Sequence, residues 1–221
     1  MIKTNKYIVL DLDSTLVHSC ADMEALNKLK VYSDHTKHNL RQRIYTFDLY
    51  DVTEDPGTGQ HMRMWGIYRP HWKQFHDFMK SYFAGVVVWS AGRPRYVDAI
   101  VNILFNDPDF QPFIVYTSDN CLDEVENIYK PLAHLIDNLN DKTQYPKFTL
   151  QNVFVVDDRE DTFSHNVENG ILIPDYSPDV KEKHILDMSD SCLLKLEKWF
   201  LRPEVYNSMD VRTLDKTHIF S

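Results

Sequence analysis

The sequence predicts an α/β fold in which a mostly parallel sheet carries helices on both faces. Five short apolar runs, rich in Val, Ile and aromatic residues, indicate buried strands at 7–12, 86–89, 113–116, 153–156 and 171–173. Segments with apolar residues at helical spacing lie between these runs. Strands that alternate with helices are typical of parallel sheets, whose ligands bind at the carboxyl ends of the strands.

The first predicted strand ends in an acidic motif. Tyr7-Ile8-Val9-Leu10 leads directly into Asp11-Leu12-Asp13-Ser14-Thr15. Side chains two positions apart leave a strand in the same direction, so Asp11 and Asp13 are expected to converge on one small volume. Two carboxylates at such a short distance repel each other, which destabilises the fold unless a cation or a shared proton lies between them. The motif therefore predicts a chemical role for both acids.

An antiparallel insertion is expected after this strand. Tyr45, Phe47 and Leu49 alternate with Thr46, Asp48 and Tyr50, a second strand-like run spans 61–68, and residues 55–59 supply a turn. Together they predict a β-hairpin over 44–68. The polar segment 21–43 is expected to form a surface helix and a loop.

Three helices are predicted farther along the chain. Pro70 and Pro94 are expected in the first turns of two of them, and residues 189–200 form the third. Their inward faces are Trp72, Phe75, Met79 and Tyr82; Val97, Ile100, Val101 and Leu104; and Leu193, Leu196, Trp199 and Phe200. At 221 residues we expect a single domain, 1–221, with an insertion at about 21–68 and a C-terminal tail at about 201–221.

Further polar groups follow the other predicted strands. Ser90-Ala91-Gly92 comes directly after residue 89, Asp157-Asp158 after residue 156, and Lys130 precedes a proline at an expected helix start. Hard oxygen ligands favour Mg²⁺ over zinc. An Asp can attack phosphorus to give an aspartyl phosphate, and Lys130 and the metal would offset charge on the transferred group. Asp13 is then available as general acid and base.

Composition excludes several other classes of protein. The formal net charge of −9 argues against a direct nucleic-acid partner, and no apolar stretch approaches the roughly 18 residues of a membrane span. Cys20, Cys121 and Cys192 form an odd, widely spaced set that suits a reducing compartment, so we expect an intracellular protein of the nucleus or cytoplasm. The oligomeric state cannot be predicted.

These motifs resemble those of the haloacid dehalogenase superfamily of aspartate-nucleophile phosphatases. Within it the chain is similar to the Fcp/Scp-type phosphatases of the RNA polymerase II C-terminal domain, over about residues 7–200. The matching segments are 11–19 (DLDSTLVHS), Tyr68-Arg69-Pro70-His71, Trp89-Ser90-Ala91-Gly92, Lys130 with its preceding tyrosine, and Val156-Asp157-Asp158-Arg159. The resemblance implies a Rossmann-like, haloacid dehalogenase-like sheet with a three-stranded insertion and no large lid.

The resemblance also implies a role for each site residue. Asp11 would be the nucleophile and Asp13 the acid and base. Mg²⁺ would be held by the Asp11 carboxylate, the Asp13 backbone oxygen and Asp158. Asp157 would orient Lys130, and phosphate would be bound by Leu12, Thr15, Ser90, Ala91 and Lys130. Two departures keep the chemistry intact: Ser90 stands where the family often has Thr, and Asp158 where its small members have Asn.

Three functions compete at this point. The first is a Mg²⁺-dependent phosphatase that acts on phosphoserine or phosphothreonine of a protein or peptide, with the hairpin 44–68 gripping residues beside the phosphate. The second is a small-molecule or nucleic-acid-end phosphatase with the same chemistry, in which residues 21–43 fold over the site. The third is a phosphopeptide-binding or assembly module without turnover.

Overall fold

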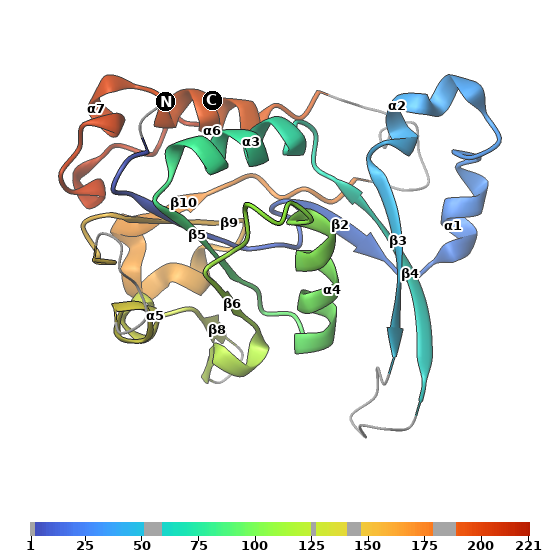
Figure 1. Cartoon of the computed structure of the whole chain (residues 1–221), viewed down its shortest axis with the longest axis horizontal. Coiled ribbons are helices and arrows are strands. Elements are labelled where there is room, and N and C mark those ends of the chain that lie inside the picture. The colour runs from blue at the N-terminus through green and yellow to red at the C-terminus, as the bar shows by residue number, and fades with distance from the viewer. Residues whose placement is uncertain (1–2, 51–58, 125–126, 141–146, 179–188) are drawn as a thin grey trace.

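A parallel sheet of five strands forms the centre of the molecule (Figure 1). The computed structural model describes residues 3–50, 59–124, 127–140, 147–178 and 189–221. The strand order is β10-β9-β1-β5-β6, and every neighbouring pair is parallel. The strands are β1 (Tyr7–Leu10), β5 (Gly85–Trp89), β6 (Ile114–Tyr116), β9 (Val153–Asp157) and β10 (Gly170–Leu172). The five strands fall on the five predicted runs, and the α/β class is confirmed.

Helical elements cover both faces of this sheet, which explains why β1, β5 and β9 are buried along their whole length. The elements are α3 (Trp72–Tyr82), α4 (Pro94–Leu104), α5 (Leu132–Asn140), the 3₁₀ segment η3 (Glu160–Asn169) and α6 (Cys192–Phe200). Ile8 and Leu10 share a core with α3, α4 and α6, whereas Tyr7 and Val9 pack with α5 and η3. Figure 1 shows α3 and α6 along one side of the sheet and α5 on the other.

The register of the strands brings their carboxyl ends to one edge. Leu10 of β1 is paired with Val88 of β5 and with Val156 of β9. The residues that follow these three positions therefore leave the sheet side by side. This is the geometry that the alternation of strands and helices predicts for a ligand site.

The helix starts confirm one predicted proline and correct the other. Pro94 is at the first turn of α4. The prediction for Pro70 was wrong, because α3 begins at Trp72 after a turn in which the Trp72 N–H donates to the Arg69 carbonyl (3.2 Å). His71 adopts a left-handed backbone (φ 66°) in that turn, so the helix cannot extend back to the proline. The third helix, predicted from residue 189, begins at Cys192.

A three-stranded antiparallel sheet, in the order β2-β4-β3, follows the first strand as the insertion. It consists of β2 (Val17–Cys20), β3 (Ile44–Tyr50) and β4 (His61–Tyr68). The pairing of β3 with β4 confirms the predicted hairpin strands. Residues 51–58, which include most of the predicted turn, lie outside the described part of the chain. Only the first of the four residues of β2 is buried, so that strand has no alternating pattern to predict it.

Residues 21–43 are helical, as expected, but they are more than a surface element. They contain α1 (Met23–Lys28), a 3₁₀ turn η1 (His35–Lys37) and α2 (His38–Arg41). Leu26, Val31 and Leu40 are buried against Trp65 and Ile67 of β4. Figure 1 shows α1 on the side of β3 and β4 that faces away from the parallel sheet. The insertion thus has a small hydrophobic core of its own.

The remaining elements had no predicted counterpart. A short hairpin, β7 (Leu122–Glu124) with β8 (Asn127–Tyr129), leads into Lys130. The C-terminal residues form α7 (Pro203–Tyr206) and a 3₁₀ turn η5 (Val211–Thr213), and the Val211 N–H donates to the Gln151 carbonyl (2.8 Å). No helix within the described residues is long and apolar enough to cross a bilayer.

Arg69, directly after β4, ties the insertion to the loop that follows β1. Its side chain is buried, and it donates to the backbone oxygens of Thr15 (3.0 Å) and Pro174 (2.7 Å). It also forms an ion pair with Asp190, with a nitrogen–oxygen distance of 2.9 Å. One guanidinium therefore connects three segments that are distant in sequence.

Replacing Arg69 by methionine should lower the free energy of unfolding by about 3 kcal/mol, because Asp190 and two backbone oxygens lose their donor. Urea unfolding measures the effect. Lys28→Met is the control, since it removes an ion pair with Glu24 whose side chains are 73% and 77% exposed. That variant should change stability by less than about 0.5 kcal/mol. Equal unfolding midpoints for the two variants would contradict the prediction.

Candidate active site

The acids that follow the strands meet in one pocket of about 190 Å³ at the carboxyl edge of the parallel sheet. Asp11 comes directly after β1, Ser90 after β5, and Asp157 ends β9. Lys130 enters from the segment between β8 and α5. The residues that line the pocket include Asp11, Asp13, Ser90, Ala91, Lys130, Asp157 and Asp158. The structure thus brings together most of the predicted site.

Leu12 and Thr15 are predicted phosphate ligands that do not line this pocket. The side chains of both are fully buried. The Thr15 hydroxyl donates to a carboxylate oxygen of Asp158 (3.0 Å) and accepts from the Asp158 N–H (3.2 Å). Any contact of these two residues with a phosphoryl group would therefore use the backbone, while the Thr15 side chain positions Asp158.

Lys130 is the central cation of the cluster. Its ammonium is buried and lies 2.7 Å from Asp11 Oδ1 and 2.6 Å from Asp157 Oδ2. Asp157 Oδ1 accepts a hydrogen bond from the Arg159 N–H (2.9 Å), so both oxygens of that carboxylate have partners. Asp157 is accordingly placed to hold Lys130 next to Asp11.

Burial disfavours the charged forms of these groups. It raises the pKa of Asp11 to about 8, with Lys130 opposing the shift and Asp157 and Asp13 adding to it. Burial by itself lowers the pKa of Lys130, but the charges of Asp11 and Asp157 outweigh this and raise it above its ordinary value. Burial also raises the pKa of Asp13 and Asp158. The cluster has more carboxylates than one ammonium can neutralise.

A divalent cation would supply the missing charge, and the donors fit Mg²⁺. Carboxylate oxygens of Asp11, Asp157 and Asp158 lie within 4.8 Å of one another. Since Asp157 already accepts hydrogen bonds at both oxygens, Asp11 and Asp158 are the better placed ligands. A set of hard carboxylate donors favours Mg²⁺ over zinc. The third predicted ligand, the backbone oxygen of Asp13, remains a prediction.

The loop after β5 is compact and polar. Ser90 is buried, and its hydroxyl accepts from the Gly92 N–H (3.0 Å). A Cβ atom on Gly92 would lie 3.0 Å from the ring of Tyr96 and 3.2 Å from the Ser90 hydroxyl, so the loop has little room for a side chain there. Helix α4 begins two residues later, with its N-terminus near the pocket. Such a loop can offer a hydroxyl and backbone N–H groups to anionic oxygens.

Tyr96 and Ser14 are neighbours of the predicted acids that no sequence pattern indicated. The Tyr96 hydroxyl donates to the Asp13 carboxylate from the first turn of α4. Ser14 has a left-handed backbone (φ 57°). Its backbone N–H donates to the Val17 carbonyl (2.8 Å), and its backbone carbonyl accepts from the Tyr176 N–H (2.7 Å). It makes the turn that directs the chain from Asp13 into β2. Neither the hydrogen bond of Tyr96 nor the turn at Ser14 can be predicted from hydrophobic periodicity.

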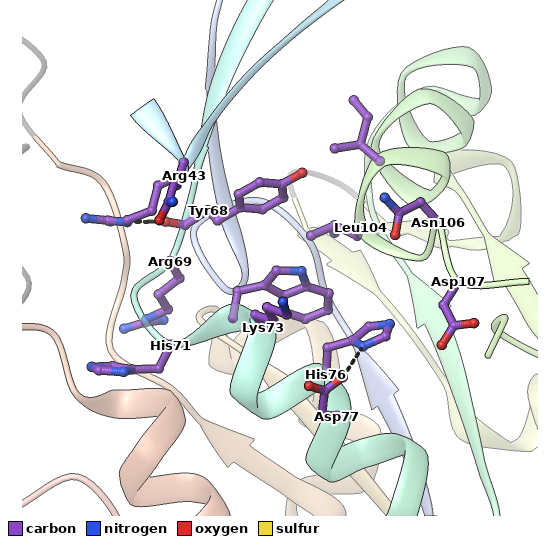
Figure 2. Close-up of a pocket in the computed structure, with 13 residues that line it drawn as sticks. Arg43, Tyr68, Arg69, His71, Lys73, His76, Asp77, Leu104, Asn106 and Asp107 are labelled. Atoms are coloured by element: carbon purple, nitrogen blue, oxygen red, sulfur yellow. Dashed lines mark hydrogen bonds and ion pairs between the residues drawn. The ribbon is translucent and has the colours of Figure 1, made fainter. Parts of the chain in front are cut away.

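A larger cavity of about 640 Å³ lies apart from the acids, beside α3 (Figure 2). Figure 2 shows two hydrogen-bonded pairs in its lining, Arg43 with the Tyr68 backbone (3.0 Å) and His76 with Asp77 (3.3 Å). None of the predicted site residues lines this cavity. We assign the chemistry to the smaller pocket, because the carboxylates and the buried ammonium are there.

Comparison with known proteins identifies a family and similar folds. The family of NLI interacting factor-like phosphatases matches residues 6–212. Two structures of the RNA polymerase II CTD phosphatase Fcp1 share the fold. A beryllium fluoride-bound variant from fission yeast is 14% identical, with a TM-score of 0.62 over 94% of this chain and 68% of that one. The other, described as an essential RNA polymerase II CTD phosphatase, is 18% identical, with a TM-score of 0.59 over 96% and 58%. No curated protein sequence matches the chain.

Mg²⁺ at about 100 times its dissociation constant should stabilise the protein by about 2.7 kcal/mol, which is on the order of 5–10 °C in melting temperature. The gain arises because the cation relieves repulsion among the carboxylates. Differential scanning calorimetry with MgCl₂ or EDTA measures it. Asp158→Ala should remove most of the gain, whereas Asp215→Ala, at an exposed acid that does not line the pocket, should keep it. The same gain in both variants would exclude Asp158 as a ligand.

Proposed function

The chain belongs to the NLI interacting factor-like phosphatase family, and on this premise we propose that it is a Mg²⁺-dependent phosphatase of phosphoserine and phosphothreonine in protein substrates. One observation carries the proposal: the buried ammonium of Lys130 holds Asp11 at the end of β1, in a pocket that Asp13 and Asp158 also line. A two-step phosphoryl transfer requires a nucleophile next to a cation and a second acid that can move a proton.

In the first step, a carboxylate oxygen of Asp11 attacks phosphorus while the bond from phosphorus to the serine or threonine oxygen breaks. Asp13, in its protonated form, gives its proton to that oxygen, so that the alcohol leaves and an aspartyl phosphate remains. Burial, which raises the pKa of Asp13, supports this protonated form. Lys130, the Ser90 hydroxyl and the backbone N–H groups of its loop would hold the phosphoryl oxygens.

In the second step, a water molecule attacks phosphorus and the carboxylate of Asp13 takes its proton. The bond between phosphorus and Asp11 breaks, which releases inorganic phosphate and restores the nucleophile. Bound Mg²⁺, held by Asp11, Asp158 and the Asp13 backbone oxygen, would supply positive charge beside the phosphoryl oxygens. Asp157 would keep Lys130 in place through both steps.

Several features support a protein substrate. The described residues between Ser90 and Lys130 form α4, β6 and the β7–β8 hairpin. They do not include a helical cap domain over the pocket. The Fcp1 phosphatases are, by their names, phosphatases of the RNA polymerase II CTD. We propose a phosphorylated segment of that kind as substrate, with the β2-β4-β3 sheet contacting the residues beside the phosphate.

The three cysteines form no disulfide bond, in agreement with the reducing nucleus or cytoplasm that we propose as the location of this protein.

Asp11→Asn should reduce turnover of p-nitrophenyl phosphate by at least about 1,000-fold, because the amide cannot form the aspartyl phosphate. Steady-state rates measure the loss, and circular dichroism checks that the fold is kept. Asp215→Asn, at an exposed acid, should leave the rate unchanged. Activity within tenfold of the wild type in Asp11→Asn would remove that residue from the mechanism.

A substrate panel should show the highest kcat/KM for phosphoserine and phosphothreonine peptides. The panel contains these peptides, sugar phosphates, nucleotides and a 5′-phosphorylated oligonucleotide, each with Mg²⁺ and with EDTA. Full activity in EDTA would contradict the metal assignment. A tenfold preference for a non-peptide ester would favour a small-molecule or nucleic-acid-end phosphatase, and no turnover of any ester would favour a binding or assembly module.

A further inference from the structure

A chain of three hydroxyl groups connects the insertion sheet with Asp13. The Tyr45 hydroxyl, from β3, lies 3.2 Å from the Ser19 hydroxyl on β2. Ser19 lies 2.8 Å from the Tyr96 hydroxyl on α4, which donates to Asp13 Oδ1. The chain thus begins in the antiparallel sheet, crosses to a helix of the parallel-sheet layer, and ends on the acid that follows β1.

The carboxylate at one end determines where the proton of Tyr96 goes. The Tyr96 hydroxyl is placed to donate to Asp13 Oδ1 and to the Ser19 hydroxyl, but it has one proton. An ionised carboxylate can only accept and is the stronger acceptor of the two, so this proton is directed at Asp13. Between Ser19 and Tyr45 either hydroxyl can donate.

The far end of the chain is held by close packing. Tyr45 is buried, and its ring lies 4.9 Å from that of Tyr68 and 5.9 Å from that of Phe47. A Cβ atom on Gly66 of β4 would lie 2.4 Å from the Tyr45 hydroxyl oxygen. Because Gly66 has no side chain, the end of the Tyr45 ring can lie directly against the backbone of β4. The hydroxyl chain therefore starts from a fixed point.

Tyr96 is also the hydrogen-bond donor that holds Asp13. Within the described residues, the Asp13 side chain accepts a hydrogen bond from Tyr96 at Oδ1, and Oδ2 has no partner. Asp13 lines the pocket of the acids. A carboxylate anchored at one oxygen keeps the other in a defined direction, whereas an unanchored one rotates.

We propose that Tyr96 is a positioning residue of the phosphatase reaction: its hydroxyl, held through Ser19 and Tyr45, fixes the Asp13 carboxylate so that Oδ2 meets the leaving oxygen of the substrate. This inference rests on the proposed function. In the step concerned, the phosphorus–oxygen bond breaks and the proton on Oδ2 moves to the oxygen of the departing alcohol. The antiparallel insertion thereby takes part in catalysis as well as in substrate contact.

The leaving group distinguishes this role from a structural one. A serine or threonine alkoxide is strongly basic and must receive a proton as it leaves. The p-nitrophenolate ion is stable without one, so its departure does not depend on the direction of Asp13. A positioning defect should therefore slow the first step for the alkyl esters and spare it for the aryl ester, whereas the second step, in which Asp13 takes the proton of water, is the same for both.

Tyr96→Phe removes only the hydroxyl. It should lower kcat/KM for a phosphoserine peptide by about 10- to 50-fold, a part of the 10²–10⁴-fold that general acid catalysis supplies, because kcat/KM reports the steps up to departure of the alcohol. For p-nitrophenyl phosphate the change in kcat/KM should stay below about threefold. Ser19→Ala should have the same pattern with a smaller loss. An equal loss on both esters, or no loss on the peptide, would overturn the proposal.

Tyr82→Phe is the matched control. Tyr82 is buried on α3 and its hydroxyl donates to the Phe200 carbonyl (2.7 Å), so this variant also removes one buried tyrosine hydrogen bond. It should leave kcat/KM on both esters unchanged, because Tyr82 does not line the pocket of the acids. A peptide-specific loss in Tyr82→Phe as large as in Tyr96→Phe would show that any lost buried hydroxyl has the effect, and would also overturn the proposal.

Crystal structures of the wild type, Tyr96→Phe and Tyr82→Phe with Mg²⁺ test the same inference without turnover. The Asp13 side chain should keep one conformer in the wild type and in Tyr82→Phe, and should rotate in Tyr96→Phe. An unchanged Asp13 conformer in Tyr96→Phe would refute the positioning role. If the wild type hydrolyses no phosphate ester, the proposed function fails, and the Asp13 conformers still decide the role of Tyr96.

Discussion

The buried ammonium of Lys130 is the interaction on which the functional end of the molecule depends. It bridges the ends of two neighbouring strands through ion pairs with Asp11 and Asp157. Without it these carboxylates would be adjacent buried anions, an arrangement that costs several kcal/mol. The lysine is itself held by its backbone N–H, which donates to the Thr162 carbonyl (2.7 Å) of η3. Elements outside the sheet thus make an acidic sheet edge tolerable.

Much of the fold could be predicted because buried strands have a distinctive composition. Strands β1 and β9 are apolar runs covered on both faces, and the meeting of parallel strand ends at one edge was enough to group Asp11, Asp157 and Ser90. The family resemblance drawn from these motifs is confirmed. The catalytic, phosphate-binding and metal-binding roles of these residues remain proposals.

The parts that could not be predicted are those that tertiary contacts determine. Strand β2 buries one residue, so only its pairing with β4 makes it a strand. Pro70 is compatible with a first helical turn and with the turn before a helix, and the left-handed backbone of the next residue decides between them. The hydrogen bond between Tyr96 and Asp13 joins positions 83 residues apart, and no periodic sequence pattern connects them. Hydrogen bonds of this kind cannot be predicted from a sequence pattern, because they depend on the folded structure.

The strand order has a consequence for synthesis of the chain. Strand β1 leaves the ribosome first, yet it lies between β5 and β9, and β9 begins only at Val153. Until β9 has been synthesised, one edge of an apolar strand has no partner and is open to aggregation. The late arrival of β9 also delays the pairing of Asp157 with Lys130, so the acidic cluster of the nascent protein forms only when β9 joins β1. Strand pairings across such a long sequence separation form slowly. A chaperone that binds the exposed strand during synthesis would protect it from aggregation.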